Sequence, residues 1–484
     1  ILESPYKRIC YYFELDDGTQ KLLYYGDFFT DHRVDDRSEY YQLPFNHPAD
    51  IAAPPAWAQD AVVYNIFPDS FATGRRFISG KPSEKEWNGQ ITRGKLGGTL
   101  RGVIENLDYI QELGATCIYL NPIFAAGEYH KYDLLDYHHI DPCFGTDEDF
   151  RQLVNDCHAR GMRVIIDGVF NHVGRGFYQF QDVLKNREAS PYLNWFHINL
   201  GGNSNYNDGL WYEGWEGNYD LVKLNLQNGE VVHHILDAVQ YWIDEFDIDG
   251  LRLDVAYCLD ENFVRTLRSF TTEKKSDFFL LGEMLHGDYN RLMNDSMLHS
   301  VTNYECYKGL YSSFNSMNMF EINHSLLRQF GPENWTLYKG KHLLSFVDNH
   351  DVTRVASILS NEKHLPLIYA MCFGMPGIPC VYYGSEWGTR ADKSQGDPAL
   401  RPCFEQPEWN ELSEFISKLA EAKKNSEALN YGSFRSVLLT NRQCIFERAS
   451  GHERVMVAIN ADGAPFTAHF DAGCGMATDL ITGQ

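Results

Sequence analysis

The chain has 484 residues, of which 14% are aromatic, and a formal net charge of -24 at pH 7. This length exceeds that of a usual single domain of about 250 residues and predicts a large domain with appendages. The acidic charge excludes nucleic acid and anionic membranes as natural partners, because both attract basic surfaces, whereas an uncharged polar substrate is compatible with it.

The eleven cysteines form no Cys-x-x-Cys pair, which predicts buried free thiols in a reducing, cytoplasmic environment and argues against a thiolate zinc site. The pairs at 138–139 and 233–234, all histidines, lack the spacing of a closed zinc site. No apolar run is long enough to cross a bilayer and no signal-like leader is present. The chain starts with Ile1 rather than Met, which leaves open the removal of a leader or an N-terminal domain.

Residues 1–50 predict a partial β module followed by a linker. Positions 6–30 alternate aromatic, aliphatic and polar residues around the Asp-Asp-Gly of residues 16–18, a pattern typical of a hairpin. The Ala-Ala-Pro-Pro of residues 52–55 then predicts a stiff connection into the main domain.

Residues 51–428 alternate apolar runs with amphipathic segments. The apolar runs show no polar alternation, which suits strands buried on both faces of a parallel sheet. We expect strands at 61–67, 117–121, 164–169, 249–255, 277–283, 300–304, 343–351 and 378–384, and helices at 99–114, 146–160, 230–246, 317–330, 365–373 and 409–424. This order predicts an α/β fold, a (β/α)8 TIM barrel.

Two further regions accompany the predicted barrel. The polar stretch 171–228, rich in Gly, Asn and Trp, is too long for an ordinary loop and predicts a functional excursion after strand three. Residues 429–484 return to a β pattern, and we expect a small C-terminal β domain with strands at 442–448, 454–459 and 465–470.

Polar clusters follow four of the predicted strands. They contain Asp167, Asp254, Glu283 and Asp351. A single acid that closes a strand could be there only for a local hydrogen bond. In a βα barrel, however, the chemistry lies at the carboxyl ends of the strands, so four repeats of this pattern favour an active site.

The segments 167–172, 250–255, 282–283 and 346–351 resemble, in order, the four short motifs of the α-amylase family, glycoside hydrolase family 13. The resemblance covers about residues 61–388. In the insertion, residues 195–198 (Trp-Phe-His-Ile) and 221–225 (Leu-Val-Lys-Leu-Asn) resemble signatures of the cyclomaltodextrinase, neopullulanase and maltogenic amylase branch. Members of this branch carry an N-terminal β-sandwich, of which residues 1–50 would hold the last part, and an inserted domain that forms one wall of the cleft.

The resemblance implies the catalytic roles. Retaining hydrolysis needs one carboxylate to bond to the anomeric carbon and one acid to protonate the leaving oxygen. By the motifs, Asp254 is the nucleophile, Glu283 the acid/base and Asp351 the third acid, which holds hydroxyls of the distorted ring. Arg252 lies on the same strand face as Asp254, and we expect its cation to lower the Asp254 pKa, while an apolar approach raises the pKa of Glu283.

Further residues are expected to bind substrate. The resemblance implies that His172 and His350 donate to sugar hydroxyls, that Tyr132 stacks beneath the sugar with His130 nearby, and that Asp167 completes this set. The alternative for each histidine is a core residue paired with a backbone carbonyl.

The chain also departs from its relatives. Tyr257-Cys258 and Leu285 replace the usual Asn-Glu and Trp on the leaving-group side, so the acceptor and the balance of hydrolysis against transglycosylation stay open. Residues 71–77 hold two arginines where several relatives bind calcium, so we expect neither calcium there nor any other cofactor. Asn121 could serve a second calcium site, although asparagine at a strand end more often forms a turn.

The predicted function is retaining hydrolysis of α-1,4-glucosidic bonds in maltooligosaccharides, cyclodextrins or pullulan. An α-glucosidase or a 4-α-glucanotransferase of the same family is the nearest alternative. A catalytically silent carbohydrate-binding barrel is a third, which the presence of all three acids disfavours. A homodimer, as found in the branch, is left open. The chain lacks the glycine fingerprint of a dinucleotide or P-loop enzyme.

Overall fold

The computed structural model describes residues 10–26, 28–36, 39–42, 53–74 and 81–484. Its centre is an eight-stranded parallel sheet in the order β18-β17-β16-β10-β9-β6-β20-β19. A parallel bridge from Thr302 to Leu344 joins β18 to β19 and closes the barrel. All eight predicted strands are confirmed, in shorter form: β6 (Val63–Ile66), β9 (Cys117–Leu120), β10 (Arg163–Gly168), β16 (Gly250–Leu253), β17 (Phe279–Gly282), β18 (Ser300–Val301), β19 (Leu344–Phe346) and β20 (Ile378–Tyr382).

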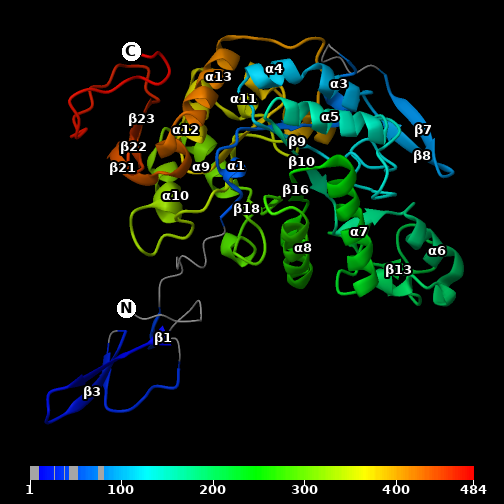
Figure 1. Ribbon diagram of the computed structural model, residues 1–484, viewed down its shortest axis with the longest axis horizontal. Coiled ribbons are helices and arrows are strands. Elements are labelled where there is room, and N and C mark those ends of the chain that lie inside the picture. Colours follow the sequence, from blue (N-terminus) through cyan, green and yellow to red (C-terminus); the bar gives the residue numbers. More distant parts are fainter. Residues whose placement is uncertain (1–9, 27, 37–38, 43–52, 75–80) are drawn as a thin grey trace.

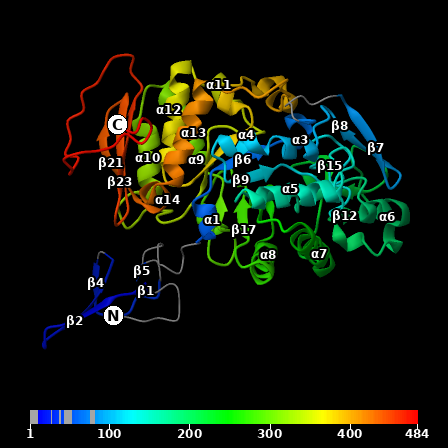
Figure 2. The ribbon, with the colours of Figure 1, turned by 45° about the horizontal axis from the view of Figure 1, so that its top comes forward.

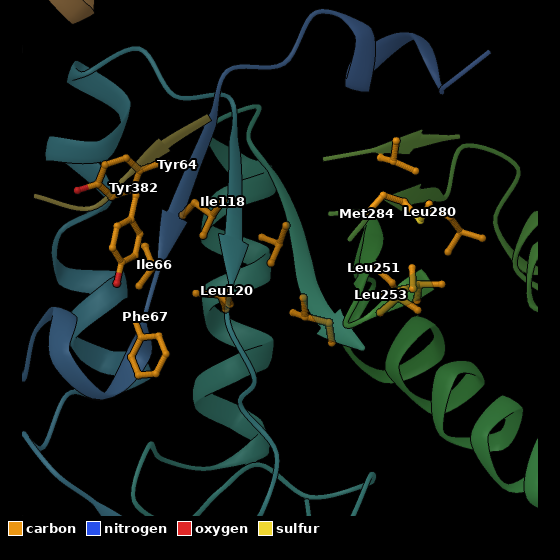
Figure 3. Packing of buried hydrophobic residues seen from close by; sticks show 14 of the residues in the cluster. Tyr64, Ile66, Phe67, Ile118, Leu120, Leu251, Leu253, Leu280, Met284 and Tyr382 are labelled. Carbon is orange, nitrogen blue, oxygen red and sulfur yellow. The ribbon is translucent and has the colours of Figure 1, made fainter. Parts of the chain in front are cut away.

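Side chains of the barrel strands alternate between two buried clusters. One set, which includes Val63, Ile165 and Leu281, fills the interior of the barrel. The intervening residues pack between the strands and the surrounding helices, among them Ile118 and Leu251 (Figure 3). Both faces of each strand are therefore apolar, which explains the unbroken apolar runs in the sequence.

Most predicted helices are confirmed, with Thr146 capping α5 in a capping box. They are α5 (Asp147–Ala159), α7 (Gly229–Phe246), α10 (Phe320–Phe330), α12 (Leu365–Gly374) and α13 (Glu411–Lys424); α8 (Glu261–Lys274) follows β16. The helix expected at 99–114 is instead two, α3 (Leu100–Glu105) and α4 (Leu107–Glu112). The break falls at Asn106, whose amide donates to the carbonyls of Gly74 and Gly102.

The prediction of strand six through residue 304 is wrong at its end. Helix α9 (Tyr304–Asn315), which the sequence pattern did not predict, begins there, and the side chain of Asn303 caps it by accepting from Cys306 N–H at 3.2 Å. An asparagine cap therefore ends the strand and starts the helix within three residues.

The insertion after β10 forms a small sheet of its own. Strands β11 (His172–Gly174), β14 (Gly214–Trp215) and β15 (Asn218–Lys223) pair, and β12 (Ile198–Asn199) pairs with β13 (Trp211–Tyr212). Helix α6 (Tyr178–Asn186) packs on it through Phe180, whose ring contacts Phe196 and Tyr212. The insertion lies at the same end of the molecule as the hairpin β7–β8 (Ser83–Trp87, Gln90–Gly94), which follows β6 (Figures 1 and 2).

The C-terminal sheet consists of β21 (Ser433–Leu439), β22 (Gln443–Ala449) and β23 (Arg454–Asn460), next to α14 (Glu427–Tyr431). The strand predicted at 465–470 is wrong: these residues are in no strand, and Phe466 and Phe470 are exposed. The missed strand β21 carries a register shift between Ser436 and Leu438, which disturbs the alternation that would reveal it in the sequence.

The predicted N-terminal hairpin is present as β2 (Phe13–Asp16) and β3 (Lys21–Tyr25), extended by β4 (Phe28–Thr30). Its turn is held by the Asp17 carboxylate, which accepts from the N–H groups of Thr19 and Gln20 at 2.8 Å. Strand β1 (Cys10–Tyr11) pairs with β5 (Tyr41–Gln42). The expected connection at 50–55 lies partly outside the described residues.

All eleven cysteines are free, and most of them are buried, as predicted. Among the described helices, none combines the length and the apolar character needed to span a bilayer.

Trp242 tests the packing between barrel and helices. It is fully buried, stacks on Phe124 at 4.5 Å and donates to the carbonyl of Tyr137 at 2.8 Å. We expect Trp242→Ala to lower the free energy of unfolding by about 3–5 kcal/mol, since it leaves a cavity and an unpaired carbonyl. Urea denaturation followed by circular dichroism measures this. Trp335→Ala, at a side chain that is 64% exposed, is the control and should stay within about 0.5 kcal/mol; equal losses would contradict the prediction.

Candidate active site

One guanidinium holds three carboxylates at the carboxyl ends of neighbouring strands. Nη1 of Arg252 lies 2.8 Å from Oδ1 of Asp167 and 2.8 Å from Oδ1 of Asp254, and Nη2 lies 3.1 Å from Oε1 of Glu283. All four side chains are buried. Strands β10, β16 and β17 are adjacent in the barrel, so acids far apart in the sequence meet around one cation.

The backbone fixes the positions of Asp254 and Glu283. Asp254 N–H donates to Gly168 O at 3.1 Å and Glu283 N–H donates to Leu253 O at 3.0 Å, so both residues continue the strand ladders. Val255 then turns the chain with φ 40, a left-handed conformation that is strained for a β-branched residue. Its N–H donates to Oε2 of Glu283 at 2.8 Å, which links the turn after one acid to the other acid.

Asp351 lies on the other side of the barrel, after β19. Its Oδ2 is 3.0 Å from Nε2 of His350, and its Oδ1 accepts from Nη2 of Arg401 at 3.0 Å. Arg401 also donates to Tyr129 and lies over the ring of Phe67, 4.7 Å from its centroid. Sequence reasoning missed Arg401, because it stands in an irregular segment after β20 outside all four motifs.

A hydrogen-bond network joins the two halves of the site. The hydroxyl of Tyr132 donates to Oδ2 of Asp167 at 2.9 Å and lies 2.8 Å from Nε2 of His350. Asn121 donates to the Tyr132 hydroxyl at 3.2 Å, and its own oxygen accepts from Asn65 at 3.1 Å. The side chain of Asn121 is therefore engaged in positioning this network.

Two predicted histidines border the acids. Nε2 of His172 lies 3.9 Å from Oδ2 of Asp254 and makes no hydrogen bond within the described part of the chain. Nδ1 of His130 accepts from the N–H of Tyr132 at 3.1 Å. Burial lowers the pKa of His172 to about 3 and that of His130 to about 4, so both rings are neutral at pH 7.

The acids differ in their pKa shifts. Burial raises the pKa of both Asp254 and Glu283, and it outweighs the opposing effect of Arg252. Arg252 lowers the pKa of Asp254, as expected, but burial and the neighbouring charges of Glu283 and Asp167 outweigh this effect. Burial also opposes ionisation of Asp351, but His350 and Arg401 overcome it and its pKa falls well below the ordinary value. The site thus combines an ionised Asp351 with two acids, Asp254 and Glu283, that retain a proton more readily than exposed carboxyls.

The insertion contributes to the site as well. Trp215 of β14 lies with its ring 6.0 Å from that of His172, a contact that no sequence motif predicted. The positions that depart from the relatives are nearby in the chain: Tyr257 and Cys258 follow Asp254 in a 3-10 turn and are half-buried, while Leu285 is 36% exposed.

No group of three or more His, Cys, Asp or Glu side chains is placed to hold a metal ion among the residues that the structure describes. Part of the segment 71–77, at which no calcium site is expected from the sequence, falls outside those residues. Of the paired histidines, His139 bonds to Asp136 and His233 contacts Asp237, whereas the rings of His138 and His234 lie 5.9 Å apart.

Comparison with known proteins agrees with this geometry. The family model for the alpha-amylase catalytic domain matches residues 65–433. A cyclomaltodextrinase of Geobacillus thermopakistaniensis (strain MAS1) is 34% identical over 100% of this chain and 83% of its own length. An intracellular maltogenic amylase of Bacillus subtilis (strain 168) is 34% identical over 88% of this chain and 72% of its own. A solved cyclomaltodextrinase structure superposes with a TM-score of 0.76 at 31% identity, covering 95% of this chain and 79% of that one. The chain belongs to the alpha-amylase family.

Proposed function

We propose that this protein hydrolyses α-1,4-glucosidic bonds of maltooligosaccharides, cyclodextrins or pullulan with retention of the anomeric configuration. The observation that carries the proposal is the placement of Asp254 and Glu283 on adjacent strand ends, both bonded to Arg252. The names of the relatives, cyclomaltodextrinase and intracellular maltogenic amylase, support an α-glucan substrate.

In the first step, a carboxylate oxygen of Asp254 attacks the anomeric carbon while Glu283 gives its proton to the leaving oxygen. The glycosidic bond breaks as the bond to Asp254 forms. In the second step, Glu283, now ionised, takes a proton from water, and the hydroxide replaces Asp254 at the anomeric carbon. The raised pKa of Glu283 suits the first step, because the group must be protonated near neutral pH.

The remaining predicted residues are proposed to bind the sugar at the point of cleavage. Ionised Asp351 would accept hydrogen bonds from ring hydroxyls, with Arg401 holding it in place. The free Nε2 of His172 faces the same space as Asp254 and is available to a hydroxyl. Tyr132 supplies a ring face parallel to that of His350, while Asp167 and His130 hold Tyr132 through its hydroxyl and its N–H.

The alternative activities differ in the molecule that accepts the glycosyl group from the enzyme. An α-glucosidase or a 4-α-glucanotransferase would use the same two acids, and the choice among them depends on the side of the site that holds Tyr257, Cys258 and Leu285. A silent binding barrel is disfavoured, because all three acids are present and Asp254 and Glu283 both contact Arg252. No cofactor enters the proposed mechanism.

We also propose an intracellular location, which the name of the Bacillus relative and the eleven free thiols support. A homodimer formed through the N-terminal strands is a further proposal. It is supported by the exposed rings of Phe13 and Phe29, which are 49% and 57% exposed in the described chain.

Glu283→Gln tests the acid assignment. We expect it to reduce the hydrolysis of β-cyclodextrin, pullulan and maltotriose by about 10²–10⁴-fold, since an amide cannot protonate the leaving oxygen. Released reducing sugar, followed over time and compared with soluble starch, measures this. Glu261→Gln, at an exposed acid on α8, is the matched control and should keep full activity. Unchanged activity of Glu283→Gln, or a wild type that cuts none of these glucans, would refute the proposal.

Arg401→Gln tests the role of the cation beside Asp351. His350 and Arg401 both lower the pKa of Asp351, so without Arg401 this pKa rises but the acid stays ionised at neutral pH. The carboxylate loses the partner that holds it in place, and we expect the KM for maltotriose at pH 7 to rise about tenfold, equivalent to about 1.4 kcal/mol. Arg390→Gln, at an exposed arginine paired with Glu362, should keep the wild-type KM. An unchanged KM in Arg401→Gln would contradict the proposed role of Asp351.

A further inference from the structure

A cavity of about 210 Å³ lies at the end of the barrel opposite the acids. Its walls are residues 339–342, which precede β19, residues 376–377, which precede β20, the end of α10, and the adjoining parts of α14, β21 and β22. Because these loops precede their strands, the cavity is at the amino ends of the strands, where α10 meets the C-terminal sheet (Figure 1). It is separate from the candidate active site, which uses the carboxyl ends.

Two buried polar atoms of the cavity wall lack a hydrogen-bond partner in the described structure. They are Nδ1 of His342 and Oδ1 of Asn430, and the two side chains are only 8% and 4% exposed. An unpaired buried polar group costs about 1–3 kcal/mol, and buried groups of native proteins are nearly always paired. A ligand that supplies an acceptor to one atom and a donor to the other would remove this cost.

The cavity wall is cationic although the chain is strongly acidic. Lys339, Lys341, Arg435 and Arg448 line it, against a single acid, Glu447. That acid is already shared by Arg435 and Arg454. The wall therefore presents an excess of positive charge in a protein of net charge -24.

Arg448 places a buried cation in the cavity wall. Its side chain is 1% exposed and donates only to the carbonyls of Gly374, Gly432 and Ser433, with no carboxylate partner among the described residues. Burial lowers its pKa to about 9. Behind it, Lys423 is also fully buried; it donates to the carbonyls of Gly377 and Leu429 and interacts electrostatically with Asp60. A buried cation without an anion is costly, so an anion bound beside Arg448 would stabilise this region.

We propose that this cavity binds a phosphate group, either free phosphate or a phosphate monoester of a small sugar. The oxyanion would accept hydrogen bonds from His342 and the surrounding cations, and a P–O–H or sugar hydroxyl would donate to Asn430. The cavity volume of about 210 Å³ is many times the roughly 10–15 Å³ that a single water molecule requires on the same measure, and it admits an ion of this size. The ring of Tyr431, 47% exposed and with its centroid 6.1 Å from that of His342, offers a face to an attached sugar.

The test is titration of the full chain with inorganic phosphate and, separately, with glucose 6-phosphate, by calorimetry and by thermal unfolding. We expect saturable binding and a rise in Tm, because a ligand of the native state stabilises it by mass action. Tighter binding of the sugar phosphate would identify the monoester as the ligand, and equal binding would identify the phosphate group alone. Both results support the site.

The double variant Lys339→Gln/Arg435→Gln removes two cations from the cavity wall. Both side chains are partly or fully exposed, so we expect the variant to fold, which circular dichroism checks. It should bind phosphate about tenfold more weakly or worse, equivalent to about 1.4 kcal/mol. The double variant Arg265→Gln/Lys274→Gln on α8 is the matched control and should bind as the wild type does.

The proposal is overturned if the wild type shows no saturable binding of either compound, or if the cavity variant and the control variant bind equally. Glu283→Gln should bind phosphate as the wild type does, because its acid is at the other end of the barrel. Failure of the proposed glucan hydrolysis and failure of the phosphate site are therefore distinguishable.

Discussion

The site depends on one interaction, the contact of the Arg252 guanidinium with three carboxylates. This guanidinium contacts Asp167, Asp254 and Glu283, one acid from each of three adjacent strands, at distances of 2.8–3.1 Å. Three buried carboxylates without it would repel one another and would each lose hydration, which costs several kcal/mol per charge. Burial outweighs the effect of this cation on the pKa values of Asp254 and Glu283, so these two acids keep raised pKa values and retain a proton more readily than exposed carboxyls. The same contact thus stabilises the barrel rim and prepares the acid.

The alternation of side chains along a strand explains why the sequence could predict so much of the arrangement of strands and acids. In every barrel strand, residues two apart share a face, so Arg252 directs its side chain to the same side as Asp254, and Leu281 to the same side as Glu283. The apolar runs that precede the acids therefore located the strands, the carboxyl ends of these strands located the site, and the resemblance to the four motifs of the family identified the acids. These features depend on local sequence, which is why eight strands and the acid cluster could be predicted without a structure.

Other features could not be predicted, because they depend on contacts between distant segments. Arg401 reaches Asp351 from an irregular loop that carries no motif, and Trp215 reaches His172 from the inserted sheet. The pKa of Asp254 is governed by burial, which the sequence does not display. At the chain ends, a register shift concealed β21, and an aromatic pattern at 465–470 suggested a strand that has no partner among the described residues.

The closure of the barrel has a consequence for its motion. Strand β18 pairs with β17 at only two positions and with β19 through the single bridge of Thr302 to Leu344, so this seam has the fewest ladder bonds in the ring. Local opening of a structure begins where backbone pairing is sparse, and amide hydrogens there exchange with solvent before those of the continuous strands. The hydroxyl of Thr302 also bonds to both the N–H and the carbonyl of Met284, directly after Glu283. Opening of the barrel at this seam would therefore first release Thr302 from Met284, while Glu283 stays tied to β16 by its N–H bond to Leu253 and by the N–H of Val255.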